Sequence, residues 1–320
     1  MSGKACLMAA TVAMVLLGVI SGCSPSARVS LQFTPNTTAS YEVTTEVTKD
    51  FRFEQPTVDK LREEQTQTLI RMGFTQTVTD VDSQGVATCD VRIDSLAITM
   101  TNKNEERLVF DSTNEAHRTN PLMKLIGQHY TVQMSPDGKV VGFDSEAAKK
   151  AVTTGVEGQV AKRLLEEVGI RERHEIPAIW DIVGQTVASK KTWKQVVPSP
   201  PGALEPKSYE KVYTLKGIET KNGHSVAVIE MKAMESAEPA PGQTQSAASG
   251  MGFFAKMFDS QDDYTGKLLL DLSSGEVLEY NETLVSTYLA KDTPANAPPA
   301  AEPDTLTMRF THRIAMKKLN

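Results

Sequence analysis

The chain has 320 residues, of which 40% are hydrophobic and 23% are charged. This balance is typical of a folded globular protein and not of a disordered one. The 34 Lys and Arg residues against 40 Asp and Glu residues give a net charge of −6. Because affinity for phosphates depends on clustered Lys and Arg, the composition argues against a nucleic-acid partner.

Residues 1–22 have the features of an export signal. Lys4 supplies a positive charge, and an almost wholly apolar stretch follows from Ala5 to Ile20. This stretch is shorter than the ~18–20 residues that span a bilayer, and it has the length of a secretory hydrophobic region. We therefore predict a signal peptide over residues 1–22.

The sequence Ile20-Ser-Gly-Cys23 at the end of this segment resembles the lipobox of bacterial lipoproteins. The resemblance implies cleavage before Cys23, attachment of a diacylglycerol to its sulfur and acylation of its new amino group. Several acyl chains would hold the protein to a membrane, at ~0.8 kcal/mol per buried methylene group. Residues 23–28 would then form a lipidated tether. The alternatives are an ordinary signal peptide with an incidental cysteine and an uncleaved anchor.

The residue after Cys23 is Ser24 and not Asp. In lipoproteins of this kind, that difference implies sorting away from the inner membrane. The expected location is therefore the cell envelope, at the periplasmic face of the outer membrane, with the membrane contacted through the N-terminal acyl chains.

Alternation of apolar and polar residues dominates the mature chain and predicts antiparallel strands with one dry face and one wet face. The clearest examples are Val29–Phe33, Tyr41–Val47, Ile70–Val78 and Leu306–Met316. Turn sequences with Gly separate many of these segments, and such residues provide the positive φ angles of tight hairpins. They end at Gly85, Gly138, Gly223 and Gly275.

The spacing of these turns predicts an internal duplication, with chance recurrence of hairpins as the alternative. We expect one β-rich domain over residues 29–320, made of two related halves, 29–143 and 186–320. A helical insert over 144–185 would join the halves. The predicted fold class is mainly β (α+β): a two-copy curved antiparallel sheet or half-open barrel, with the insert on its concave face.

Within the insert, apolar residues spaced by four predict one helix over about residues 145–168. Gly155 and Gly158 lie in its middle and would weaken it by up to ~1 kcal/mol each. Such a stripe is ordinarily core and not a ligand groove. Its members are Ala148, Val152, Val156, Val160, Leu164 and Val168.

No catalytic, metal-binding or cofactor-binding motif is recognised. The His174-Glu175 pair lacks the second histidine of a zinc protease helix, and Pro177 would interrupt that helix. Cys89 alternates with apolar neighbours and is expected to be a buried thiol and not a nucleophile. His312 falls on the apolar face of the last strand, where a hydrogen-bonded core histidine is expected.

One apolar patch stands out within a polar linker and is the candidate contact site. At helical spacing its side chains would form one apolar side, and they are Phe253, Phe254, Met257 and Phe258. The patch is interpreted either as a clip that folds back onto the sheet, or as a mobile lid or contact surface for lipid or a partner protein.

The segments Ile182–Trp193, Tyr213–Glu219, Gly223–Glu230 and Gly266–Val277 resemble a group of uncharacterised bacterial envelope lipoproteins. The chain departs from that group by Gln185, where Asp is usual, and by a longer gap to Trp193. The resemblance implies a β-rich second half, and because the shared motifs are structural, no catalytic residue can be carried over from it. The general plan is also similar to the LolA and LppX carriers of lipoproteins and lipids, as a likeness of fold.

These observations favour a non-catalytic, lipid-anchored envelope protein that binds an apolar ligand or handles lipid or lipoprotein. The second hypothesis is an envelope scaffold or assembly partner that uses its polar outer face. The third is a hydrolase whose catalytic residues are dispersed in the sequence. A tightly filled interior without a cavity would contradict the first hypothesis.

Overall fold

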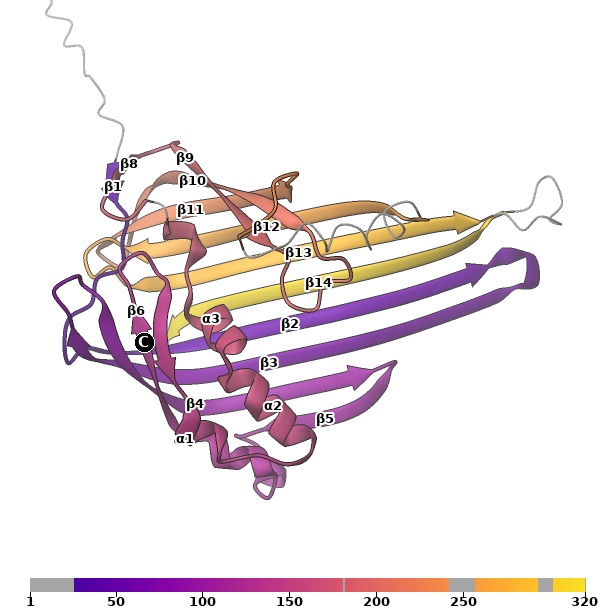
Figure 1. Ribbon diagram of the computed structural model, residues 1–320, viewed down its shortest axis with the longest axis horizontal. Helices are drawn as coiled ribbons and strands as arrows, with labels where there is room; N and C mark the ends of the chain where they lie inside the picture. The colour runs from indigo at the N-terminus through magenta and orange to yellow at the C-terminus, as the bar shows by residue number, and fades with distance from the viewer. Residues whose placement is uncertain (1–25, 181, 242–256, 293–301, 320) are drawn as a thin grey trace, which may run out of the picture.

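The computed structural model describes residues 26–180, 182–241, 257–292 and 302–319 (Figure 1). In this part of the chain, a large antiparallel sheet has the strand order β7-β6-β4-β3-β2-β14-β13-β12-β11-β10-β9, and β5 also pairs with β4. Its strands are β2 (Thr38–Gln55), β3 (Lys60–Val81), β4 (Ala87–Asn102), β5 (Glu105–Asp111), β6 (His129–Met134), β7 (Val140–Asp144), β9 (Thr192–Pro198), β10 (Ser208–Lys221), β11 (His224–Glu235), β12 (Asp259–Asp271), β13 (Val277–Asp292) and β14 (Asp304–Leu319).

The predicted mainly-β fold with a large antiparallel sheet is confirmed, and the sheet is not closed into a barrel. The last strand, β14, pairs with β2 in the middle of the sheet, so segments from the two ends of the described sequence lie side by side there. A small second sheet joins β1 (Ser26–Arg28) to β8 (Thr186–Ala188). The division into two related halves remains a prediction.

Alternate residues of the central strands form the core, as the sequence pattern predicts. Tyr41 and Val43 on β2 lie opposite Phe74 and Met72 on β3, and all four side chains are buried. Val43 also lies opposite Met316 on β14. One face of the sheet, which we call the inner face, is therefore apolar where these strands meet.

The strand predicted over residues 29–33 is wrong, although Val29 and Leu31 are buried as expected. This N-terminal segment crosses the end of the sheet and is held by two hairpin turns. The Leu31 amide donates to the Pro136 carbonyl at 2.9 Å, and the Gln32 amide donates to the Gly275 carbonyl at 3.3 Å. The alternating burial thus comes from packing against turns and not from a strand ladder.

The single helix predicted over residues 145–168 is also wrong. The insert contains α1 (Glu146–Lys149), α2 (Gly155–Leu165) and α3 (Glu167–His174). Gly155 has a φ of +72°, which interrupts a right-handed helix, and Glu166 is extended between α2 and α3. As a result, Val156 and Val168 of the predicted apolar stripe are exposed. Short 3-10 helices are η1 (Pro56–Val58), η2 (Glu115–His117), η3 (Pro121–Leu125) and η4 (Pro177–Ile179).

The insert lies across the inner face of the sheet (Figure 1). Its last part contacts both edges of the sheet. Near one edge, the Trp180 indole donates to the carbonyl of Gly138, in the turn between β6 and β7, at 3.5 Å. At the other edge, the indole of Trp193 on β9 donates to the Ala178 carbonyl at 3.0 Å. Because one short segment reaches both edges, the sheet must curve around it, and the inner face is concave.

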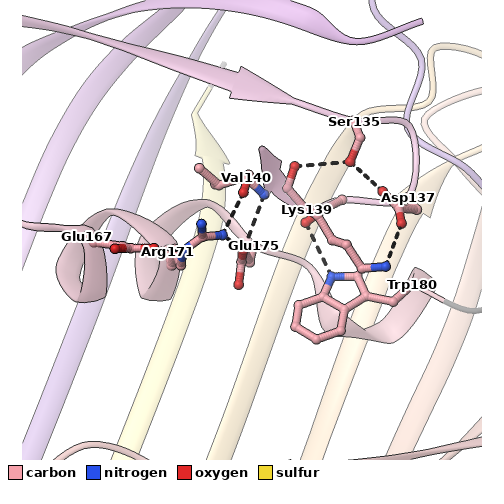
Figure 2. Close-up of polar contacts among 9 residues, drawn as sticks. Ser135, Asp137, Lys139, Val140, Glu167, Arg171, Glu175 and Trp180 are labelled. Atoms are coloured by element: carbon pink, nitrogen blue, oxygen red, sulfur yellow. Dashed lines mark hydrogen bonds and ion pairs between the residues drawn. The ribbon is translucent and has the colours of Figure 1, made fainter. Parts of the chain in front are cut away.

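A side chain of α3 and that of Glu175, the residue after it, also cap the edge strand β7, as Figure 2 shows. Arg171 donates to the carbonyl of Val140 at 2.6 Å, and Glu175 accepts from the amide of Val140 at 3.2 Å. The two side chains pair with each other at 2.7 Å. Unpaired groups at a sheet edge can recruit another strand. This contact therefore protects the edge and fixes α3 beside the hairpin of β6 and β7.

Candidate functional site

A cavity of about 240 Å³ opens where the N-terminal segment crosses the end of the sheet, beside its inner face. Strands β2, β3, β6 and β14, the turn between β12 and β13, and the end of α3 contribute to it. Apolar side chains form one part of its walls, among them Leu31, Phe33, Phe74, Val78, Met134 and Met316.

The rim of the cavity is polar. It includes exposed or half-buried side chains, among them Gln32, Thr34, Thr37, Ser273, Ser274 and Glu276. Glu276 pairs with Lys318 at 2.7 Å. Among the described residues that line the cavity, Glu276 is the one Asp or Glu, and no Lys or Arg lines it. The interior therefore suits an apolar group better than an anion.

The size of the cavity limits what it can hold. An apolar protein cavity of ~150 Å³ already binds benzene, whereas sites for drug-sized ligands have roughly 300–1,000 Å³. At about 240 Å³, the cavity has room for roughly eight groups of the size of a water molecule, at about 30 Å³ each. It fits a short hydrocarbon chain or the end of a longer one.

A buried hydrogen-bond network borders the cavity at His174, the last residue of α3. The Nε2 atom of His174 lies 2.8 Å from the hydroxyl oxygen of Tyr130 on β6. That oxygen also accepts a hydrogen bond of 3.0 Å from Nε of Arg173, which donates in turn to the Leu164 carbonyl at 3.1 Å. All three side chains of the network are buried, and only 3% of His174 is exposed.

The network defines the protonation of His174. Burial, and secondly the positive charge of Arg173, hold the pKa of His174 well below its ordinary value, so the ring is neutral at pH 7. The Tyr130 oxygen accepts from Arg173, so its own proton is free to bond Nε2. A neutral ring that accepts at Nε2 carries its proton on Nδ1. No described residue accepts a hydrogen bond from that Nδ1–H group.

Tyr41 is the second polar group that faces the cavity. It lies on β2 opposite Phe74, and the Phe74 ring contacts the rings of both Tyr41 and His174, with centroids 5.6 Å and 5.1 Å away. Only 8% of Tyr41 is exposed, and its hydroxyl bonds no other described residue. Burial, and secondly the charge of Glu276, raise the pKa of Tyr41, so its hydroxyl stays protonated.

A separate buried cluster lies on the inner face of the second half of the sheet. Lys211 on β10 pairs with Glu282 on β13 at 2.6 Å, and the hydroxyls of Tyr264 and Tyr280 donate to the same carboxylate at 2.9 Å and 2.5 Å. Burial raises the pKa of Glu282, but Lys211 and the two tyrosines outweigh it and hold that pKa below its usual value. These groups satisfy one another and leave no comparable cavity.

The residues predicted from sequence lie elsewhere. Cys23, Phe253 and Phe254 fall outside the described residues. Met257 is half exposed and Phe258 half-buried, just before β12, and neither lines the cavity. The structure therefore does not test the proposed lid.

The predictions for Cys89 and His312 are confirmed. Cys89 is fully buried, and burial raises the pKa of its thiol to about 12, which suppresses the reactive thiolate. His312 is a buried, hydrogen-bonded histidine, with Nε2 at 2.7 Å from Glu172. His174, by contrast, was considered only as a zinc ligand, and its role beside the cavity was missed.

Within the described ranges, no three His, Cys, Asp or Glu side chains gather in an arrangement that could hold a metal ion. No helix in that part of the chain has both the length and the apolar character needed to cross a membrane.

The comparisons with known proteins add little. No family model matches the chain, and no curated protein matches it, so the resemblance to envelope lipoproteins remains a prediction. Among solved structures, one of lipovitellin and its lipid–protein interactions is similar over 90% of this chain and 26% of its own, with 7% sequence identity and a TM-score of 0.44. This chain thus spans about a quarter of that structure, and the similarity is too low to carry a functional conclusion.

Proposed function

We propose that this protein is a lipid-anchored, non-catalytic protein of the bacterial envelope that binds an apolar ligand, such as part of a lipid, in the cavity of about 240 Å³. The cavity is the observation that carries the proposal. Apolar side chains such as Phe74 and Met316 lie in the walls of this open pocket, and covering apolar surface with a ligand is favourable. A bound hydrocarbon group would fill it without a compensating charge.

The position of the cavity near the N-terminus supports the proposed link to a membrane. Leu31, which lines the cavity, follows Cys23 by eight residues. Eight residues span at most about 29 Å, even when the chain is fully extended. A chain acylated at Cys23 would therefore keep the cavity close to a membrane surface, from which an apolar ligand could enter.

Native mass spectrometry of the mature protein, isolated gently from its own cells, tests ligand binding. We expect an added mass that organic extraction releases. The variant Ala39→Phe places a ring in the cavity and should lose the added mass. The variant Ala315→Phe is the matched control, because Ala315 lies on β14 beside the inward-facing Met316 and on the opposite face of the sheet. Ligand-free wild-type protein, or equal retention in both variants, would contradict the proposal.

The lipid anchor needs its own test, because the described residues begin at Ser26. Cells fed with labelled palmitate should incorporate the label into the wild-type chain and not into Cys23→Ala. Recovery of the unlabelled chain from the cytosol with residues 1–22 still attached would remove both the anchor and the envelope location from the proposal.

A further inference from the structure

Two hydrogen-bond donors of buried residues face the cavity, and the proposed function does not explain them. Neither the Tyr41 hydroxyl nor the Nδ1–H group of His174 has an acceptor among the described residues. Both residues line the cavity and are more than nine-tenths buried. Neither donor atom is among the fully buried polar atoms that lack a partner, so both are open to the cavity, where water can reach them. A ligand that displaced this water without offering an acceptor would leave a donor unpaired, at a cost of about 1–3 kcal/mol. We therefore expect a ligand of this cavity to carry an acceptor.

We propose that the ligand is an uncharged acyl compound, such as an ester or a ketone, whose carbonyl oxygen accepts hydrogen bonds from Tyr41 and from Nδ1 of His174 while its hydrocarbon chain lies against the apolar walls. This inference rests on the proposed function and specifies its ligand. The rings of Tyr41 and His174 both lie against the ring of Phe74, which places the two residues at the same part of the cavity wall.

The charge around the cavity selects a neutral carbonyl over a carboxylate. The described lining contains no Lys or Arg to pair with an anion, and its one acidic side chain, Glu276, is already paired with Lys318. The nearest buried cation, Arg173, already donates to Tyr130 and to the Leu164 carbonyl. A free fatty acid would therefore lose the hydration of its carboxylate without gaining an ion pair. An ester or ketone loses much less.

Three small probes of nearly equal size test the inference: heptan-2-one, octane and heptanoate. Their binding to the full mature chain can be followed by NMR of isotope-labelled methionine methyl groups, because Met134 and Met316 line the cavity. The comparison is between wild-type protein and Tyr41→Phe. This substitution removes one hydroxyl that bonds no other described residue, so the fold should be unaffected.

We expect Tyr41→Phe to weaken heptan-2-one binding roughly two- to tenfold, the range for one hydrogen bond, and to leave octane binding unchanged. In wild-type protein, heptan-2-one should also shift the Nδ1–H resonance of His174 downfield, whereas octane should not. The second readout does not depend on any variant.

The failures are distinguishable. If both probes bind but Tyr41→Phe affects neither and the His174 resonance is unmoved, the carbonyl inference is wrong and the apolar site stands. If heptanoate binds more tightly than heptan-2-one, the ligand class is an anion and the inference is wrong. If neither heptan-2-one nor octane binds, both the carbonyl inference and the proposed function are wrong.

Discussion

The hydroxyl oxygen of Tyr130 lies 2.8 Å from Nε2 of His174, and this contact joins the edge hairpin of the sheet to the end of α3. The same oxygen accepts from the buried guanidinium of Arg173. One phenol group therefore satisfies two buried partners, orients the imidazole toward the cavity and fixes its tautomer.

Removal of this hydroxyl in Tyr130→Phe should be costly. The substitution leaves Nε2 of His174 and Nε of Arg173 buried without a partner, and one of them belongs to a charged group. We expect the free energy of unfolding to fall by about 2–4 kcal/mol, measured by urea denaturation. Tyr41→Phe is the matched control and should change it by less than about 0.5 kcal/mol. Equal effects of the two variants would contradict the assigned network.

The lowered pKa of His174 predicts a loss of stability in mild acid. The unfolded chain binds a proton at this residue near pH 6.5, whereas the folded chain does so only at much lower pH. Stability is therefore complete above about pH 7 and falls as the pH drops below about 6.5, by about 1.4 kcal/mol per pH unit for this one proton.

Urea denaturation of wild-type protein and His174→Gln at pH 7.5, 6.5 and 5.5 measures that slope. The variant should be less stable at pH 7.5. Its free energy of unfolding should then fall less steeply toward pH 5.5, because unfolding of the variant takes up about one proton fewer. Parallel slopes in the two proteins would show that His174 is protonated in the folded state.

Strand alternation and turn residues are local properties, and they predicted the fold class and the hairpins well. The turns at Gly85, Gly138, Gly223 and Gly275 all have glycine at positive φ, as expected. Errors arose where distant contacts decided the structure. Residues 29–33 alternate like a strand, but their amides bond two hairpin turns that are remote in sequence.

The candidate site was not predictable for the same reason. Tyr130 and His174 are 44 residues apart, and no local pattern links them. The sequence pattern predicts only that Tyr41 faces inward from a strand. Tyr41 and His174 share Phe74 as a neighbour because the insert folds back over that residue. The sequence does show that His174 follows an arginine at a predicted helical segment. That observation alone does not indicate a ligand site, because the neighbours of His174 are known only from the structure.

The ion pair of Lys211 and Glu282 should behave differently from pairs on the surface. Both side chains are buried, so Lys211→Met or Glu282→Gln alone leaves an uncompensated charge or carboxylate inside the sheet. We expect each single variant to lower the free energy of unfolding by about 3–5 kcal/mol, and the double variant to lose much less than the sum.

The exposed pair of Lys216 and Glu230 provides the control, because it joins β10 to the neighbouring strand β11 at 3.2 Å. The same substitutions there should cost less than about 1 kcal/mol. A double-mutant cycle by urea denaturation measures both couplings. A buried coupling as small as the exposed one would mean that water reaches Lys211.

Gly275 and Gly223 occupy hairpin turns at positive φ, +69° and +84°, but only Gly275 touches the N-terminal segment. A Cβ atom at Gly275 would lie 2.4 Å from the backbone nitrogen of Gln32, whereas one at Gly223 would meet no heavy atom within 4 Å. Both Gly→Ala variants incur the strain of positive φ, about 1–2 kcal/mol, and Gly275→Ala must also displace residues 31 and 32. We therefore expect Gly275→Ala to destabilise the protein clearly more than Gly223→Ala.

The displaced segment forms one wall of the cavity, so the effect should extend beyond stability. Hydrogen exchange of the Leu31 and Gln32 amides, which bond the two hairpin turns, should accelerate in Gly275→Ala and stay slow in Gly223→Ala. Binding of heptan-2-one should weaken only in the first variant, because Leu31 and Gln32 would no longer close the cavity. Equal stability, exchange and binding in the two variants would show that the turn at Gly275 does not hold the wall in place.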